Sequence, residues 1–180
     1  YKIPFIDEAS IEDSIECLAV GLYLGIDKNA IEERMASLEP VAMRLEVKEG
    51  RHDCTLINDS YNSDINSLDI ALDFMSRRPD GKERQRVLIL SDIYQTGKPL
   101  SQLYSEVSAL MKQRSVDQFI GIGPEICAHK DCFEQQQSSF FLTVQDFIDS
   151  ELFSNLRDNI ILLKGARRFG FDKITELLVK

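Results

Sequence analysis

The feature that most constrains the fold is a change of hydrophobic period near residue 40. Before it, apolar residues recur at helical spacing, and after it, short apolar runs alternate with amphipathic segments to the end of the chain. Such alternation is typical of an α/β sheet that is mostly parallel and covered by helices on both faces. We therefore predict an α/β domain preceded by a short helical segment.

Two helices are predicted before residue 40. Ser10-x-x-Asp13 resembles a capping box for the first helix, Asp27 is predicted to cap the second, and Pro40 ends it. Each helix carries an apolar stripe at helical spacing. The stripe residues are Ile11, Ile15, Leu18 and Leu22 in the first helix, and Ile31, Met35 and Leu38 in the second.

The remainder of the chain predicts six strands. The first is expected to be half-buried, because Leu45 and Val47 alternate with polar residues, whereas continuous apolar runs indicate strands that are covered on both faces. The predicted strands are residues 44–48, 55–57, 87–90, 118–122, 140–142 and 160–163. Helices are expected around residues 68–75 and 100–114, after Pro124, and at residues 174–178.

Composition excludes several classes of protein. The chain has 21 Lys and Arg against 30 Asp and Glu, and no basic stripe that would grip nucleic acid by its phosphates. Its longest uncharged apolar stretch, residues 17–26, is about half the ~20 residues that a membrane span needs. Four cysteines are too sparse for a disulfide scaffold. We expect a cytoplasmic protein that binds neither nucleic acid nor membrane, and Tyr1 in place of Met suggests a piece cut from a longer chain.

Three familiar sites are disfavoured by spacing. The sequence contains no G-x-x-x-x-G-K-[ST] phosphate loop. Residues 121–126 begin like a dinucleotide fingerprint, but Ile126 stands where the third glycine belongs, so a tight strand-to-helix turn is favoured. His52-x-Cys54 and Cys127-x-His129-x-x-Cys132 lack the paired spacings of structural zinc sites, so we expect no metal site.

Polar clusters follow three of the predicted strands, at residues 58–62, 91–92 and 164–168. In open α/β sheets, ligands bind outside the carboxyl ends of the strands. Acids there can accept bonds from ribose, an aromatic ring can stack a base, and a cation can neutralise phosphate or carboxylate. Asp59 and Asp92 could equally cap helices, and from the residues alone both interpretations stay open.

Residues 57–64 (Ile-Asn-Asp-Ser-Tyr-Asn-Ser-Asp) resemble the Asn-Asp-x-Tyr-Asn-Ala-Asn-Pro motif of the Mur ligases. Residues 37–45, ending in Met-Arg-Leu, resemble the stretch that joins the central and C-terminal domains of these enzymes. Residues 90–97 resemble the family's Gly-Asp-Met-x-Glu-Leu-Gly, and residues 163–167 its Lys-Gly-Ser-Arg. The four motifs occur in the family's order and together span nearly the whole chain.

The resemblance implies a layout and a reaction. Residues 1–42 would be the helical end of the central ATPase domain, and residues 43–180 a complete, Rossmann-like C-terminal domain. The family branch that matches best is an ATP-dependent ligase that joins D-alanyl-D-alanine to UDP-MurNAc-tripeptide through an acyl-phosphate. Its phosphate loop, magnesium ligands and carbamylated lysine would lie upstream of Tyr1, and the stop at Lys180 permits the fused alanine racemase that some members carry.

The resemblance also assigns site residues, though no catalytic residue and no metal ligand. It implies that one set of residues binds the nucleotide, and that Arg44 in this set reaches the phosphates. It also implies that two cations at the end of the last strand bind the carboxylate of the dipeptide. The nucleotide set is Asp13, Arg44, Asp59, Tyr61 and Asn62, and the substrate pair is Lys164 and Arg167. The departures from the family pattern are Asp13, Asp64, Ile65, Ser91, Gln95 and Ala166.

Two expectations follow from this layout. The isolated chain should be inactive, hold neither ATP nor Mg²⁺ firmly and bind ATP at roughly millimolar concentration, because the phosphate loop is absent. Its two N-terminal helices should pack as a pair and leave part of their apolar face exposed. A receiver-like signalling module and a dinucleotide-binding domain are the alternative interpretations.

Overall fold

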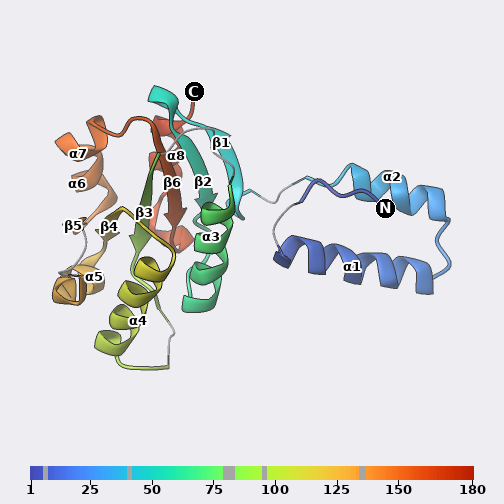
Figure 1. Ribbon diagram of the computed structural model, residues 1–180, viewed down its shortest axis with the longest axis horizontal. Helices are drawn as coiled ribbons and strands as arrows, with labels where there is room; N and C mark the ends of the chain where they lie inside the picture. Colours follow the sequence, from blue (N-terminus) through green and yellow to red (C-terminus); the bar gives the residue numbers. More distant parts are fainter. Residues whose placement is uncertain (6–7, 40–41, 79–83, 95–96, 134–136) are drawn as a thin grey trace. The chain divides into compact units, whose positions relative to one another are not determined.

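The computed structural model describes residues 1–5, 8–39, 42–78, 84–94, 97–133 and 137–180 (Figure 1). The chain divides into two compact units, Tyr1–Val41 and Ala42–Lys180. This division falls beside the boundary predicted after residue 42, although Pro40, on which that prediction partly depended, lies outside the described residues. The assignment of the first unit to an ATPase domain stays a prediction.

The first unit contains helices α1 (Glu8–Tyr23) and α2 (Lys28–Ala36). Asp27 caps α2 as predicted, because its carboxylate accepts the backbone N–H groups of Asn29 and Ala30. The predicted capping box at Ser10 is wrong. Helix α1 begins at Glu8, so Ser10 lies inside the helix, where its carbonyl accepts the Ser14 hydroxyl.

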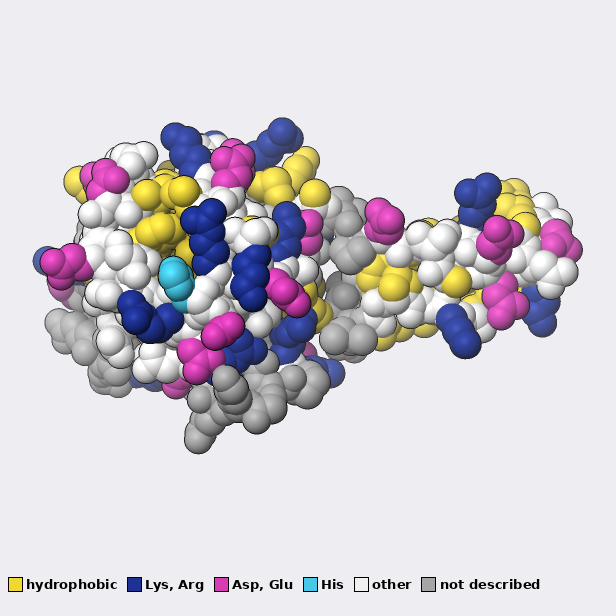
Figure 2. Space-filling view, turned by 90° about the horizontal axis from the view of Figure 1, so that it is seen from above, with side chains coloured by type: hydrophobic (Ala, Val, Ile, Leu, Met, Phe, Trp, Pro, Cys, Tyr) yellow, Lys and Arg dark blue, Asp and Glu magenta, His cyan; other side chains and the backbone are white. Residues whose placement is uncertain are grey.

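Helices α1 and α2 pack against each other and bury part of the predicted stripes. Ile31 and Met35 of α2 are buried, and Gly21 of α1 lets Ile31 approach closely. Ile15 and Leu22 of the α1 stripe remain exposed, because a single neighbouring helix covers only part of so wide an apolar face. Hydrophobic side chains accordingly show at the surface of this unit, as expected (Figure 2).

The second unit is built on a six-stranded sheet with the order β1-β2-β6-β3-β4-β5. All neighbouring strands are parallel except β1 and β2, which are antiparallel. The mostly parallel α/β fold is therefore confirmed. The strands are β1 (Glu46–Glu49), β2 (Thr55–Asp59), β3 (Gln85–Ser91), β4 (Gln118–Ile122), β5 (Gln137–Phe141) and β6 (Asn159–Lys164).

The last strand, β6, lies between β2 and β3 rather than at an edge (Figure 1). Counting the parallel strands along the chain, the order is 1-5-2-3-4, whereas receiver-like and dinucleotide-binding sheets run 2-1-3-4-5 and 3-2-1-4-5-6. The strand order of this sheet thus differs from that of a receiver-like module and from that of a dinucleotide-binding domain. It also brings the end of β6 beside the ends of β2 and β3, where Lys164 is level with Asp59 and Leu90.

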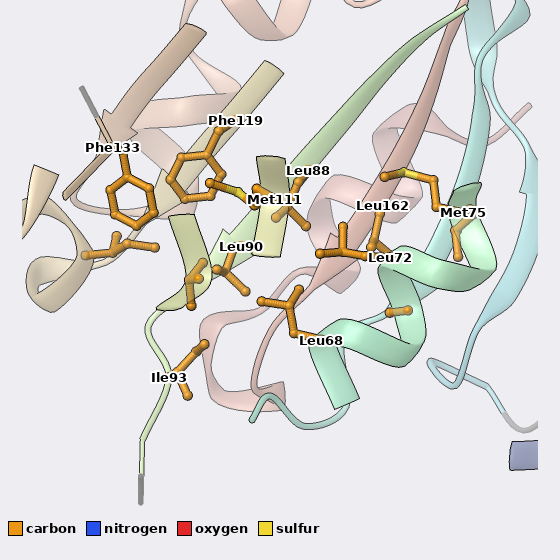
Figure 3. Close-up of a cluster of buried hydrophobic side chains, with 14 of the residues drawn as sticks. Leu68, Leu72, Met75, Leu88, Leu90, Ile93, Met111, Phe119, Phe133 and Leu162 are labelled. Atoms are coloured by element: carbon orange, nitrogen blue, oxygen red, sulfur yellow. The ribbon is translucent and has the colours of Figure 1, made fainter. Parts of the chain in front are cut away.

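Helices cover both faces of the sheet, because alternate strand residues point to opposite sides. Leu88 and Leu90 of β3 point to one face and pack with α3 (Ile65–Arg77) and α4 (Leu100–Gln113) (Figure 3). Val87 and Ile89 point to the other face. There they pack with α6 (Val144–Ile148), α7 (Glu151–Ser154) and α8 (Asp172–Leu178). The shorter elements are α5 (Pro124–Ala128), η1 (Arg51–Asp53), η2 (Lys130–Phe133) and η3 (Arg167–Phe169).

Strand β1 differs from its predicted orientation. Leu45 was expected to share a buried face with Val47, but Val47 is 38% exposed and Leu45 packs against the core from outside the strand. Leu45 has a left-handed backbone with φ 47°, so its side chain does not continue the alternation of the strand. Within the described residues, no helix is both long and apolar enough to cross a membrane.

Candidate functional site

Six of the seven predicted site residues converge where β2 and β6 end. The two strands are parallel neighbours, so the loops that follow them leave the sheet side by side. The converging residues are Arg44, Asp59, Tyr61, Asn62, Lys164 and Arg167. Asp13, the seventh, lies on α1 of the helical unit, where its side chain is exposed.

Asp59 and Lys164 form a buried ion pair. The Lys164 Nζ lies 2.8 Å from Asp59 Oδ2, and the two side chains are 2% and 10% exposed for Lys164 and Asp59. The same ammonium donates a second hydrogen bond, also 2.8 Å long, to the backbone carbonyl of Asn62. Asp59, which was predicted to bind the nucleotide, and Lys164, which was predicted to bind the dipeptide, therefore neutralise each other's charge.

Arg44 lies over the ring of Tyr61, with its guanidinium carbon 4.6 Å from the ring centroid. Both side chains reach solvent, and Tyr61 is 45% exposed. Arg44 stands between two residues with left-handed backbone, Met43 at φ 62° and Leu45 at φ 47°. The Leu45 N–H points to Asp59 Oδ1 at 3.4 Å, so the carboxylate that pairs with Lys164 also contacts the Arg44 segment.

The loop after β6 is hydrogen-bonded to both neighbouring loops. Arg167, in η3, donates its backbone N–H to the carbonyl of Tyr61 at 3.1 Å. Ala166 donates its N–H to the hydroxyl of Ser91 at 3.1 Å. Arg167 is exposed, so its guanidinium lies at the surface beside the Tyr61 loop. The three predicted polar clusters thus form one connected group.

Asp92 acts as a helix cap, which was one of the two interpretations left open. Its buried carboxylate accepts the backbone N–H groups of Glu125 and Ile126 at the start of α5, and the hydroxyl of Tyr94. Gly123 forms the predicted tight turn before α5, with φ 138°. A Cβ at Gly123 would lie 2.5 Å from the Asp92 carboxyl carbon, so glycine is required for this close approach.

The sequence patterns did not single out an aromatic contact beside the candidate site. Arg168 lies over Tyr94, with its guanidinium carbon 3.3 Å from the ring centroid, and Phe169 stacks on Tyr94 with centroids 6.1 Å apart. Burial and the neighbouring Asp92 raise the pKa of Tyr94, so its hydroxyl remains protonated at neutral pH. Tyr94 lies in a loop, and Arg168 and Phe169 lie in the short η3, where no periodicity marks them.

The residues considered for zinc are dispersed. Across the described ranges, no group of three or more His, Cys, Asp or Glu side chains could hold a metal. His52 and Cys54 lie where β2 begins, whereas Cys127 and His129 belong to the α5 region. His129 Nδ1 hydrogen-bonds to the backbone carbonyl of Glu125 at 2.8 Å, so this imidazole makes a local contact within the α5 region.

An open groove of about 390 Å³ lies at the opposite end of the sheet, where β2 begins. It contains no predicted site residue, so it does not mark the candidate site. Figure 2 looks down on this end of the sheet unit, where Lys and Arg side chains gather near hydrophobic ones. The groove is lined by Lys48, Arg51, Thr175, Glu176, Val179 and Lys180.

No protein-family model matches the chain. Among curated proteins it is 21% identical to the UDP-N-acetylmuramoyl-tripeptide--D-alanyl-D-alanine ligase of Bacillus subtilis, over 100% of this chain and 40% of that protein. The ligase of the same name from Escherichia coli is 23% identical over 68% of this chain and 26% of its own length. The chain thus spans about two fifths or less of these relatives.

Solved structures of Mur ligases share the fold. A crystal structure of MurF from Acinetobacter baumannii matches 97% of this chain and 39% of its own, with a TM-score of 0.82 and 18% identity. MurF from Thermotoga maritima, solved in complex with ADP, matches 89% of this chain and 35% of its own, with a TM-score of 0.68 and 18% identity. The chain is therefore similar along its whole length to part of the Mur ligases that add D-alanyl-D-alanine, and it has the fold of that part.

Proposed function

We propose that this chain is the C-terminal part of a cytoplasmic, ATP-dependent ligase that adds D-alanyl-D-alanine to UDP-MurNAc-tripeptide in peptidoglycan precursor synthesis. Residues 1–42 would complete the central ATPase domain, and residues 43–180 would form the C-terminal domain. The observation that carries the proposal is the contact of Arg44 with Tyr61, because two residues assigned to the nucleotide meet at the surface in a domain with the Mur ligase fold.

The reaction requires activation of a carboxylate. The tripeptide carboxylate takes the γ-phosphoryl group of ATP and releases ADP. The dipeptide amine then attacks the acyl-phosphate, loses a proton and displaces inorganic phosphate. ATP supplies the phosphoryl group, and Mg²⁺ bound elsewhere in the ligase would neutralise the phosphate charge. The T. maritima relative solved with ADP supports a nucleotide site in this family. We propose that the phosphate loop and magnesium ligands belong to the rest of the ligase, since this sequence lacks the loop.

The candidate site fits the sugar, base and phosphate edge of a nucleotide. Tyr61 is 45% exposed, so its ring can be reached for stacking, and the loop that carries it accepts hydrogen bonds from Lys164 and Arg167. Arg44 lies over the ring and is itself exposed, so those of its five N–H donors that do not contact the ring can bind phosphate oxygens. Asn62 is exposed and supplies an acceptor in the same loop, whereas the Asp59 carboxylate is buried and already accepts from Lys164 and the Leu45 N–H.

Arg167 is the better candidate of the two predicted cations for the dipeptide carboxylate. Its side chain is exposed beside the candidate site, whereas the Lys164 ammonium is buried against Asp59. A guanidinium can bind a carboxylate through two parallel hydrogen bonds. The partners of the intact ligase would be ATP, UDP-MurNAc-tripeptide, D-alanyl-D-alanine and the remaining domains of the same chain.

The test is a titration of this chain with Mg-ATP, followed by NMR of backbone amides. We expect shifts at residues 44–45 and 59–62, a dissociation constant of roughly 1 mM, and no phosphate release. Tyr61→Ala should weaken the binding that produces these shifts, and Arg51→Ala, at the far end of the sheet, should leave them unchanged. Micromolar affinity, phosphate release, or shifts confined to the groove around Arg51 would contradict the proposal.

A further inference from the structure

We propose that Lys164 is a positioning residue for the nucleotide loop, here residues 59–62, and does not bind the dipeptide. The inference rests on the proposed function, which assigns this loop to the nucleotide. It changes the role that the resemblance implies for Lys164. It also joins the nucleotide loop to the last strand of the sheet, 105 residues further along the chain.

The first support is how the ammonium is used. A lysine ammonium has three N–H donors, and that of Lys164 directs two of them at this loop, to the Asp59 carboxylate and the Asn62 carbonyl. These contacts hold the loop at both of its ends. The side chain is 2% exposed, so a dipeptide carboxylate could reach the ammonium only if the loop were displaced.

The second support is what the loop holds in turn. Asp59 also contacts the Leu45 N–H, next to Arg44, and the Tyr61 carbonyl accepts the Arg167 N–H. The contact between Arg44 and Tyr61 therefore depends on backbone that Lys164 helps to fix. Without the ammonium, Asp59 would be a buried carboxylate with no cation, and the loop would open to hydrate it.

The most direct experiment is amide hydrogen exchange on this chain. In Lys164→Met, which keeps the length and removes the charge, protection of the Leu45 and Arg167 amides should fall at least about tenfold relative to wild type. The β3 and β4 amides report global stability. They should change less than the two loop amides, so the loop should open separately from the sheet. Lys173→Met, an exposed lysine on α8, is the matched control and should leave both sets unchanged.

Lys164→Met leaves the Asp59 carboxylate buried without a cation, which could prevent this variant from folding. In that case a second variant that removes both charges is needed. Asp59→Asn/Lys164→Met supplies that variant, and it should show the same local loss of protection at Arg167. Loop protection equal to wild type in either folded variant would overturn the inference. So would a loss of protection at Arg167 no larger than that in β3 and β4, which would indicate a merely structural pair.

Steady-state kinetics of the ligase expressed from the complete gene distinguish two roles of Lys164, positioning of the nucleotide loop and direct contact with the dipeptide. Lys164→Met should raise KM for ATP or lower kcat at least about tenfold, with KM for D-alanyl-D-alanine within about twofold of wild type. A selective rise in KM for the dipeptide would overturn the inference and restore a direct contact. An unsubstituted protein without ligase activity would refute the proposed function, and the exchange result would stand independently.

Discussion

Arg44 and Tyr61 form a cation–π contact at the surface, with 4.6 Å between the guanidinium carbon and the ring centroid. The first residue precedes β1 and the second follows β2, two strands that run antiparallel. Antiparallel pairing places the start of β1 beside the end of β2, so both residues reach the same edge of the sheet. The contact is therefore a direct consequence of the strand arrangement, and it defines the predicted nucleotide surface.

Replacing Tyr61 should distinguish stacking from hydrogen bonding. Tyr61→Ala should weaken ATP binding about 3- to 30-fold, since it removes both the surface that stacks the base and the partner of Arg44. Tyr61→Phe should stay within about twofold of wild type because the aromatic face is retained. Calorimetry or NMR titration with Mg-ATP measures both. Equal losses in the two variants would indicate that the hydroxyl, not the ring, makes the important contact.

Arg44→Ala should act mainly on turnover in the complete ligase. We expect kcat to fall about 10- to 100-fold, the cost of one charge-assisted hydrogen bond, with a smaller change in ATP affinity. The reason is that an arginine that reaches the phosphates on domain closure stabilises the closed state more than initial binding. Steady-state kinetics and equilibrium ATP binding give the two numbers. A loss confined to ATP affinity would contradict this role.

Arg167→Ala should raise KM for D-alanyl-D-alanine more than KM for ATP. Loss of a charge-assisted bond to the dipeptide carboxylate corresponds to about 1.5–3 kcal/mol, or about 10- to 100-fold. Arg157→Ala is the matched control, because Arg157 is also exposed but precedes β6, whereas Arg167 follows it. Equal effects of Arg167→Ala on both substrates would argue for a structural role of η3 instead.

The cap of α3 should make stability depend on pH. Burial opposes ionisation of Asp64, but hydrogen bonds from the Ser67 backbone and hydroxyl outweigh it, so the pKa of this carboxyl lies below its usual value. A lowered folded pKa stabilises the protein above the unfolded pKa of about 3.9, and this contribution disappears as pH falls through the folded pKa. Asp64→Ala should therefore cost about 0.5–2 kcal/mol at pH 7 and less at pH 3.

Urea unfolding at the two pH values tests this prediction. Asp64→Asn is the control, because asparagine caps a helix about as well as aspartate but does not titrate. It should retain most of the stability at pH 7 and lose less stability than wild type on acidification. A difference between wild type and Asp64→Ala that grew towards pH 3 would have the wrong sign for this account.

Local patterns predicted most of the fold. Continuous apolar runs located β3, β4 and β6, because a strand that is covered on both faces leaves an uninterrupted signal in the sequence. The orientation of β1 could not be predicted, since it depends on the left-handed backbone at Leu45. The capping box at Ser10 failed because α1 starts one turn or less earlier, and helix ends are the least certain feature of such patterns.

The site was only partly predictable because its contacts are not local. Sequence spacing separates Asp59 from Lys164 by 105 residues, and no periodicity reports that β6 lies between β2 and β3. The resemblance therefore assigned the two residues to different ligands, although they form one buried pair. Gln95, another departure from the family pattern, lies outside the described residues. Asp64 replaces a family asparagine and serves as the cap of α3.

The central claim is tested most directly by assaying the protein expressed from the complete gene for dipeptide-dependent phosphate release. The account predicts release of one phosphate per ligation when ATP, Mg²⁺, UDP-MurNAc-tripeptide and D-alanyl-D-alanine are all present, and background release when any one is omitted. The ligated product should appear by mass spectrometry in equal amount. Background release with the complete mixture, or release that does not require the dipeptide, would contradict it.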